Sequence, residues 1–149
     1  MPAKSTVERA KEDLREGKSP TTAAGEFVHE EIEHVRRGKH GARSPQQAIA
    51  IGLSRARRAG VPLPPPAPGK ASEKTRKSAE RAYRKGQAGA KRPARKYSRI
   101  REQVLKREPR TTISRKALSQ QATRAASRRK PAARVGAARR AASTRRRAA

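Results

Sequence analysis

The sequence lacks cysteine and tryptophan, and its aromatic residues are one Phe and two Tyr. The absence of cysteine excludes disulfides and cysteine-based zinc sites. The shortage of aromatics argues against the base-stacking platforms of single-strand binders. No apolar run approaches the roughly 18 residues of a membrane-spanning helix, and the N-terminus lacks the apolar stretch of a signal peptide. We therefore expect a soluble protein that stays where it is made.

Large apolar residues are also few. Leu, Ile, Val and Phe together fill 17 of 149 positions. A fraction below roughly 20% with a large net charge is typical of disordered chains, which cannot bury enough apolar surface to offset the entropy of ordering. The fold class we predict is mostly α with large disordered regions. A short helical hairpin is followed by a Pro-rich linker, basic helices and a disordered Ala/Arg tail.

Positive charge is what the chain has in excess. There are 40 Lys and Arg against 12 Asp and Glu, a net charge of +28 and a pI near 11.9. Residues 1–60 carry only +4 of this charge and residues 61–149 carry +24. From Pro109 onward there are 13 basic residues and no acid. A pI above about 9 is the electrostatic footprint of a nucleic-acid binder, because a polyanion relieves the self-repulsion of such a chain.

Helix signals are clearest before residue 60. In residues 1–20, the run from Ser5 to Glu8 forms a capping-box pattern and Gly17 can end a helix.

In residues 21–60 we predict a helical hairpin. Its first helix runs from Thr22 or Gly25 to Arg37, and its second starts at the cap Ser44 and ends at Gly60. The hairpin is expected to bury Phe27, Val28, Ile32, Val35, Ile49 and Leu53.

The rest of the chain is punctuated by proline. Residues 61–71 contain a proline cluster that predicts an extended polyproline spacer. Residues 72–130 contain three candidate basic helices, Glu73–Lys85, Ser98–Glu108 and Thr112–Arg129, which we expect to order only on a partner. Residues 131–149 form a low-complexity Ala/Arg tail.

The segment His29 to His34 superficially resembles a zinc-protease motif. That chemistry needs histidines four apart on one helical face, whereas these are five apart and roughly 140° out of alignment. We therefore expect a solvated helix face, with no metal and no cofactor. The acids in and just before this segment, Glu26, Glu30, Glu31 and Glu33, are interpreted as the exposed side of the helix. The alternative is that they fold back on the basic tail and autoinhibit it.

Basic residues around the hairpin allow several interpretations. The set comprises Lys39, His40, Arg43, Arg55, Arg57 and Arg58. It is either a solvated helix end or a patch that contacts phosphates. A third alternative is a sequence reader like the second helix of a helix-turn-helix, for which Gln46 and Gln47 are the only base-reading candidates.

Residues 44–60, SPQQAIAIGLSRARRAG, resemble a small family of basic bacterial proteins with a domain of unknown function built around QAIAIGLSxARRAG. Further resemblance lies in GEFVHEE (25–31), GKHGARS (38–44), LPPP (63–66), KTRKSAER (74–81), KRE (106–108) and KALS (116–119). The resemblance implies a bacterial, cytoplasmic protein and supplies no activity or site. The tail is similar in composition to histone H1-like bacterial proteins.

The function we expect is binding of nucleic acid, duplex DNA before RNA, by phosphate neutralisation without sequence preference. We expect no enzymatic activity, because no core holds catalytic groups in place. The protein would be a histone-like component of the bacterial nucleoid, with no membrane or small-molecule partner. One alternative is an RNA or ribosome binder. A second is a protein-interaction module in which the hairpin at 22–60 docks a protein partner and the tail adds avidity. The candidate nucleic-acid-binding residues are Lys39, Arg43, Arg55, Arg57, Arg58, Lys74, Arg76, Lys77, Arg81, Arg84, Lys85, Arg115, Lys116, Arg124, Arg128, Arg129, Lys130, Arg134, Arg139, Arg140, Arg145, Arg146 and Arg147.

Overall fold

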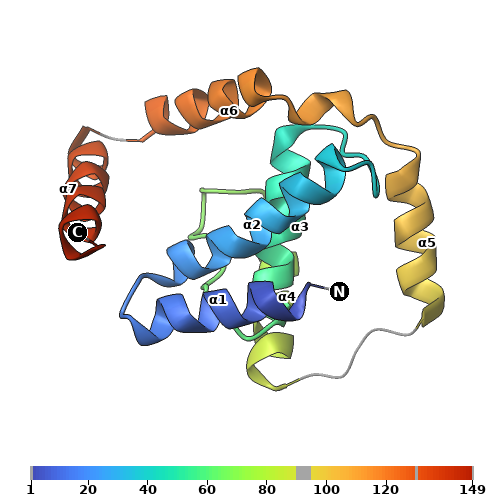
Figure 1. Ribbon diagram of the computed structural model, residues 1–149, viewed down its shortest axis with the longest axis horizontal. Coiled ribbons are helices and arrows are strands. Elements are labelled where there is room, and N and C mark those ends of the chain that lie inside the picture. Colours follow the sequence, from blue (N-terminus) through green and yellow to red (C-terminus); the bar gives the residue numbers. More distant parts are fainter. Residues whose placement is uncertain (1, 90–94, 130, 149) are drawn as a thin grey trace. The chain divides into compact units, whose positions relative to one another are not determined.

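The computed structural model describes residues 2–89, 95–129 and 131–148, and all regular structure among them is helical. The mostly helical class is therefore confirmed (Figure 1). The chain divides into two compact units, Met1–Ile113 and Ser114–Ala149. The elements are α1 (Lys4–Arg15), α2 (Pro20–Arg36), α3 (Pro45–Arg58), α4 (Glu73–Gln87), α5 (Arg95–Lys106), the 3-10 turn η1 (Thr111–Ile113), α6 (Arg115–Ser127) and α7 (Pro131–Ala148).

Side-chain caps fix the starts of α2 and α3. As predicted, Ser44 caps α3, where its hydroxyl accepts a hydrogen bond from Gln47 N at 3.2 Å. The Gln47 side chain reaches back to accept from Arg43 N at 2.6 Å. The predicted start of α2 was wrong, because Ser19 caps that helix and accepts from Thr22 N at 3.3 Å. A capping serine directly followed by proline outweighs the later signals.

The predicted cap of the first helix was also wrong. Ser5 lies inside α1, and Ala3 precedes the helix without a side-chain capping bond. The start of α1 is tied to the neighbouring helix instead, because Ala3 N donates a hydrogen bond to Glu30 Oε1 at 2.8 Å. A tertiary contact thus replaces the local cap.

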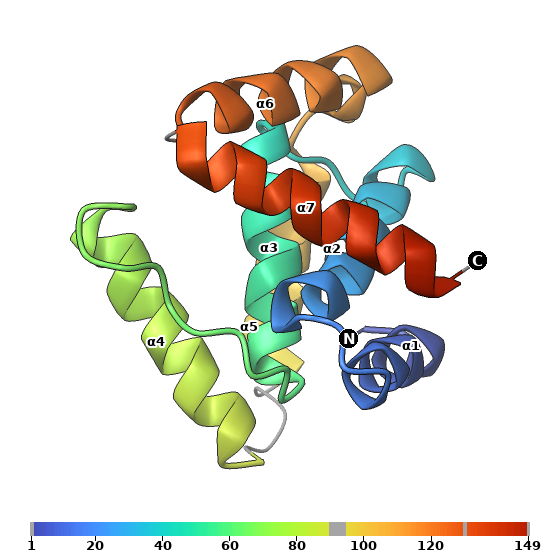
Figure 2. The ribbon, with the colours of Figure 1, turned by 90° about the vertical axis from the view of Figure 1, so that its left-hand side faces the viewer.

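The core of the first unit is built mainly from small side chains. Helix α2 packs against α1 and α3, and α3 packs against α4 (Figures 1 and 2). Of the six residues predicted to be buried, Phe27 and Val35 are buried and the other four are partly buried. A Cβ at Gly52 would lie 2.6 Å from Val28 Cα, so the two helix backbones nearly touch there. The main core cluster is Ala10, Ala23, Ala24, Phe27, Ala56, Val61 and Leu63.

The Pro-rich segment begins inside the core, not as a free spacer. Val61 and Leu63 are buried, and the guanidinium of Arg57 holds the segment in place. Arg57 Nε donates to Leu63 O and its Nη2 to Pro64 O, both at 3.1 Å. No helix or strand is assigned over residues 61–67, and Leu63 N donates to Val61 O at 2.7 Å in a tight turn around Pro62.

Helix α4 docks on α3 through alanines and a glycine. Ala79 and Ala82 are buried. We predicted this helix to end at Lys85, but α4 continues through Gly86 to Gln87. A Cβ at Gly86 would lie 2.8 Å from the carbonyl carbon of Arg57 and closer still to its oxygen. Gly86 therefore allows the close contact between α4 and α3. Helix α4 packs against another helix of the same chain, although we expected it to order only on a partner.

The loop between α2 and α3 binds the last turn of α5 and the segment that follows it. Gly41 N donates to Leu105 O and Ala42 N to Pro109 O, each at 2.9 Å. Thr112 donates its hydroxyl to Ala42 O. The segment ends in the buried Ile113, and the predicted single helix 112–129 is divided there into η1 and α6.

The described part of the second unit consists of α6, α7 and a few residues that flank α6. Ser114 caps α6 by accepting from Ala117 N at 3.1 Å, and α6 buries no residue. Helix α7 covers 131–148, where we predicted a disordered tail. Alanine and arginine are strong helix formers, and this local preference needs no core. None of the described helices is long and apolar enough to cross a membrane.

Candidate nucleic-acid interface

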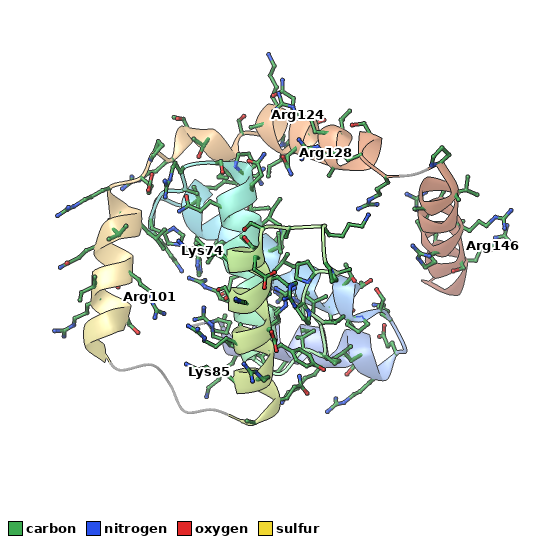
Figure 3. All side chains as sticks on the ribbon, turned by 180° about the vertical axis from the view of Figure 1, so that it is seen from behind. Lys74, Lys85, Arg101, Arg124, Arg128 and Arg146 are labelled. Carbon is green, nitrogen blue, oxygen red and sulfur yellow. The ribbon has the colours of Figure 1, made fainter. Side chains whose placement is uncertain are left out.

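A row of exposed cations runs along α4. Its members are Lys74, Lys77, Arg81, Arg84 and Lys85, and we call them the α4 row. At 100° per residue they share one side of the helix, roughly opposite the buried Ala79 and Ala82. From Lys74 to Lys85, labelled in Figure 3, the row extends about 16 Å along the helix axis. Docking on α3 therefore turns the charged face of α4 to solvent.

The remaining basic candidate on α4 is paired within the helix. Arg76 is half-buried, and its Nη2 and Nε donate to the Glu73 carboxylate at 2.8 and 3.0 Å. These hydrogen bonds lower the pKa of Glu73 below its usual range. Acidic residues in a first turn also suit the helix dipole. Arg76 is thus less free to reach a phosphate than the α4 row, in which Lys77 makes a looser and more exposed contact with the same carboxylate, its Nζ 3.6 Å from Glu73 Oε1.

The second unit holds basic residues and no acid. Arg124 and Arg128 are labelled in Figure 3, as is Arg146 of α7. Lys130 lies outside the described residues, as do the side chains of Arg134 and Arg147. The exposed candidates here are Arg115, Lys116, Arg124, Arg128, Arg129, Arg139, Arg140, Arg145 and Arg146.

Two candidates on α3 serve the fold instead. Arg57 is buried against the Pro-rich segment, and Arg55 Nη1 lies 2.7 Å from Glu31 Oε2. Both interpretations as phosphate contacts are therefore corrected. Arg58 is exposed and donates to Ser54 Oγ at 2.7 Å.

The other two hairpin candidates, Lys39 and Arg43, are exposed. Arg43 Nε lies 3.5 Å from Glu108 Oε1, so it borders the docked segment after α5.

Sequence reasoning missed exposed cations on α5. Arg99 and Arg101 are both exposed (Arg101 is labelled in Figure 3). Lys106 of this helix pairs with the acid Glu102 at 3.0 Å. The signal was present in the sequence, since the helix was predicted, but its basic residues were left out of the candidate set.

The acidic run on α2 is part of the packing, and its interpretation as an exposed face was wrong. Glu30 and Glu31 are buried. Glu26 pairs with Arg9 Nε at 2.5 Å. Glu33 pairs with Arg36, the last residue of α2, and with Arg37, the residue after it. All four carboxylates thus have partners within Met1–Ile113. Helix α2 can bury an acid at Glu31 because Arg55 of α3 supplies a cation that pairs with it.

A cluster of charged and imidazole groups joins α2, α3 and the intervening loop. It consists of Glu30, Glu31, His34, His40 and Arg55, and we call it the α2–α3 charge cluster. Glu31 Oε1 lies 3.4 Å from His40 Nε2, and His34 Nε2 lies 3.5 Å from Glu30 Oε1. Burial raises the pKa of Glu31, against the opposing charges of Arg55 and His40. Burial also lowers the pKa of His34.

Comparison of the chain with protein families, with curated proteins and with solved structures finds no match.

Proposed function

We propose that this protein binds nucleic acid through its phosphates, without reading sequence, and that duplex DNA is its ligand. The α4 row carries the proposal. Five cations stand on one solvent face of a helix whose opposite face is fixed against α3. Their side chains need no large rearrangement to meet a polyanion, and the acid-free second unit adds further positive charge.

The dimensions of the row suit a phosphate backbone. Duplex DNA carries one charge per about 1.7 Å of its axis, so a row about 16 Å long faces roughly nine or ten phosphate charges. Several cations can therefore be neutralised at once, with release of counterions. The proposed action is binding and charge neutralisation, not catalysis.

Gln47, one of the two residues predicted as candidates for reading bases, has a structural role. The Gln47 side-chain oxygen accepts from Arg43 N beside the cap of α3. Base readout needs a set of outward donors and acceptors on one element, which the α4 row of Lys and Arg does not provide. This supports binding that ignores sequence.

The test compares two variants that lose the same charge. In the row variant, the five cations of the α4 row become Gln. In the control, five exposed cations of α1, α2 and the residue after α2 become Gln: Lys4, Lys11, Arg15, Arg36 and Arg37. Binding to a short labelled duplex is measured by fluorescence anisotropy from about 50 to 200 mM salt, with helix content checked by circular dichroism.

The slope of log K against log salt reports the number of phosphate contacts. With about eight contacts in the full chain, affinity should fall by about four orders of magnitude over this range. If three to five contacts come from the α4 row, the row variant should lose about 2.7 to 4.5 units of slope, and the control variant less than about one. Equal losses in the two variants would reject the α4 row as the interface.

Competitors separate the other candidate ligands. A ribosomal RNA fragment that displaces the duplex, and resists excess duplex in return, would replace DNA by RNA as the ligand. A protein that still co-purifies after nuclease treatment would favour the interaction module. We further propose that the protein is bacterial, as its resemblance to the QAIAIGLSxARRAG family implies, and that it acts at the nucleoid, because its positive charge suits DNA.

A further inference from the structure

Three groups able to bind a metal converge at the end of α2. Glu31 and His34 are three residues apart on that helix and so share a face. The loop after α2 returns His40 to the same place, and ligand atoms of all three residues lie within 4.8 Å of one another. Glu31 is fully buried, and the side chain of His40 is 8% exposed.

The hydrogen bonding of His40 leaves a lone pair that needs a cation. Its Nδ1 lies 3.0 Å from Gly41 O, and a carbonyl oxygen can only accept, so Nδ1 carries the proton. In the neutral ring, Nε2 then presents its lone pair to Glu31 Oε1, 3.4 Å away. Both atoms are buried and neither has a hydrogen-bond partner. Two acceptors face each other, and a positive species between them would satisfy both.

The other two members of the α2–α3 charge cluster hold the ligands in orientation. Glu30 Oε1 lies 3.5 Å from His34 Nε2, which would direct the lone pair of His34 to Nδ1. That lone pair faces Arg55 Nη1 at 3.4 Å, so the Arg55 guanidinium has to move away from Nδ1 when an ion binds there. Arg55 Nη1 lies 2.7 Å from Glu31 Oε2, so Oε1 is the oxygen left for an ion. A carbonyl behind one histidine and a carboxylate behind the other form the outer shell commonly found around zinc-bound histidines.

We propose that Glu31, His34 and His40 bind a Zn²⁺ ion. Two imidazoles and one carboxylate are a ligand set that Zn²⁺ accepts, with a fourth position for water. Ligand atoms about 2.0 to 2.1 Å from a tetrahedral ion stand about 3.3 Å apart. The separation of Glu31 Oε1 and His40 Nε2 already matches this value, and His34 needs a small side-chain movement to close the set. Glu30 and Glu31 together offset Arg55 and one charge of the ion.

The proposal replaces the expectation of no metal. The zinc-protease spacing concerned His29 and His34, but His29 is exposed and lies outside the cluster. The second histidine comes from the loop at residue 40, which helical spacing cannot reveal. Zinc binding is independent of the nucleic-acid interface, and its test uses no nucleic acid.

The experiment titrates Zn²⁺ into the full chain after chelator treatment, with a chromogenic chelator as competitor. We expect one equivalent to bind, and we expect the melting temperature to rise with zinc. Co²⁺ should give the intense visible absorption of a four-coordinate site. The test variants are His34→Gln and His40→Gln. The matched control is His29→Gln, which changes an exposed histidine on the same helix.

Loss of a supporting outer-shell residue can lower metal affinity by roughly 100-fold. Loss of a ligand should lower the affinity for Zn²⁺ at least as much. The control should bind like the native chain. Circular dichroism checks each variant, and His34→Gln decides the test if His40→Gln loses its helix signal. Absence of stoichiometric uptake would overturn the proposal and assign the contact between Glu31 and His40 to a proton. Uptake that both variants retain, or that His29→Gln abolishes, would overturn it as well.

Discussion

Replacing Gly86 by alanine should release α4 from α3. The added Cβ would lie 2.8 Å from Arg57 C, closer still to its oxygen, and 3.2 Å from Arg58 Cα. These are backbone atoms of α3 and cannot rotate away. Alanine in place of glycine favours an isolated helix by about 1 kcal/mol, whereas overpacking costs about 1 to 3 kcal/mol or more. Because the clash involves backbone, we place the net loss of docking at about 2 kcal/mol.

The measurement is the rate of limited trypsin digestion within α4, where the α4 row supplies the cleavage sites. When opening is fast, cleavage follows the population of the open form, so about 2 kcal/mol should speed it about 30-fold. Far-UV circular dichroism should show no loss of helix, since the alanine itself favours helix.

Gly25→Ala is the matched control. Gly25 is exposed inside α2, and a Cβ there would have nothing within 4 Å. This substitution should stabilise the first unit by up to about 1 kcal/mol and leave digestion of α4 unchanged. If Gly86→Ala digested no faster than Gly25→Ala, the docking of α4 through Gly86 would be refuted.

Three further outcomes follow from single contacts. Ser44→Ala should lower the stability of the first unit by about 1 kcal/mol in a urea melt, because α3 loses its capping hydroxyl; Ser44→Gly should cost only a few tenths. Arg57→Met should cost roughly 2 kcal/mol in the same melt, because it leaves two carbonyl partners without a donor; a loss like that of an exposed arginine would contradict this. Glu73 should titrate by NMR below the ordinary glutamate range, and Arg76→Gln should raise its pKa. The stabilising contact is present above the ordinary glutamate pKa and is lost as pH falls through the lowered value, so loss at higher pH would show the sign to be wrong.

The sequence predicted the helices well where local chemistry decides them. Ser44 followed by proline fixed the start of α3, and Ser72 caps α4 by accepting from Thr75 N at 3.2 Å. The start of α1 was missed because its fixing contact, from Ala3 N to Glu30, joins residues 27 positions apart. Local propensity carries no information about such a contact.

Composition was a poor guide to how much of the chain packs. The count of Leu, Ile, Val and Phe treats alanine and glycine as neutral, yet alanines fill most of the core and Gly52 and Gly86 mark the closest helix approaches. Small residues bury little area each, but they allow backbones to meet and gain dispersion contacts over their whole length. A helix with alanines and a glycine on its packed face, such as α4, is therefore a docking signal that a count of large residues overlooks.

The distribution of acids explains how the molecule can be strongly basic and still pack its first unit. All 12 acidic residues fall within Met1–Ile113, and none lies in Ser114–Ala149. Within the first unit, acids meet cations at helix contacts, as Glu26 does with Arg9 and Glu31 with Arg55. Cations that are paired in this way hold helices together and add little to the electrostatic field around the protein. On α4, Glu73 pairs with Arg76 and Lys77, and the second unit contains no acid, so the field that attracts a polyanion is concentrated on the other cations of the α4 row and on the second unit. Candidate phosphate contacts in this protein are thus better chosen by what neutralises each cation in the fold than by how many cations a segment holds.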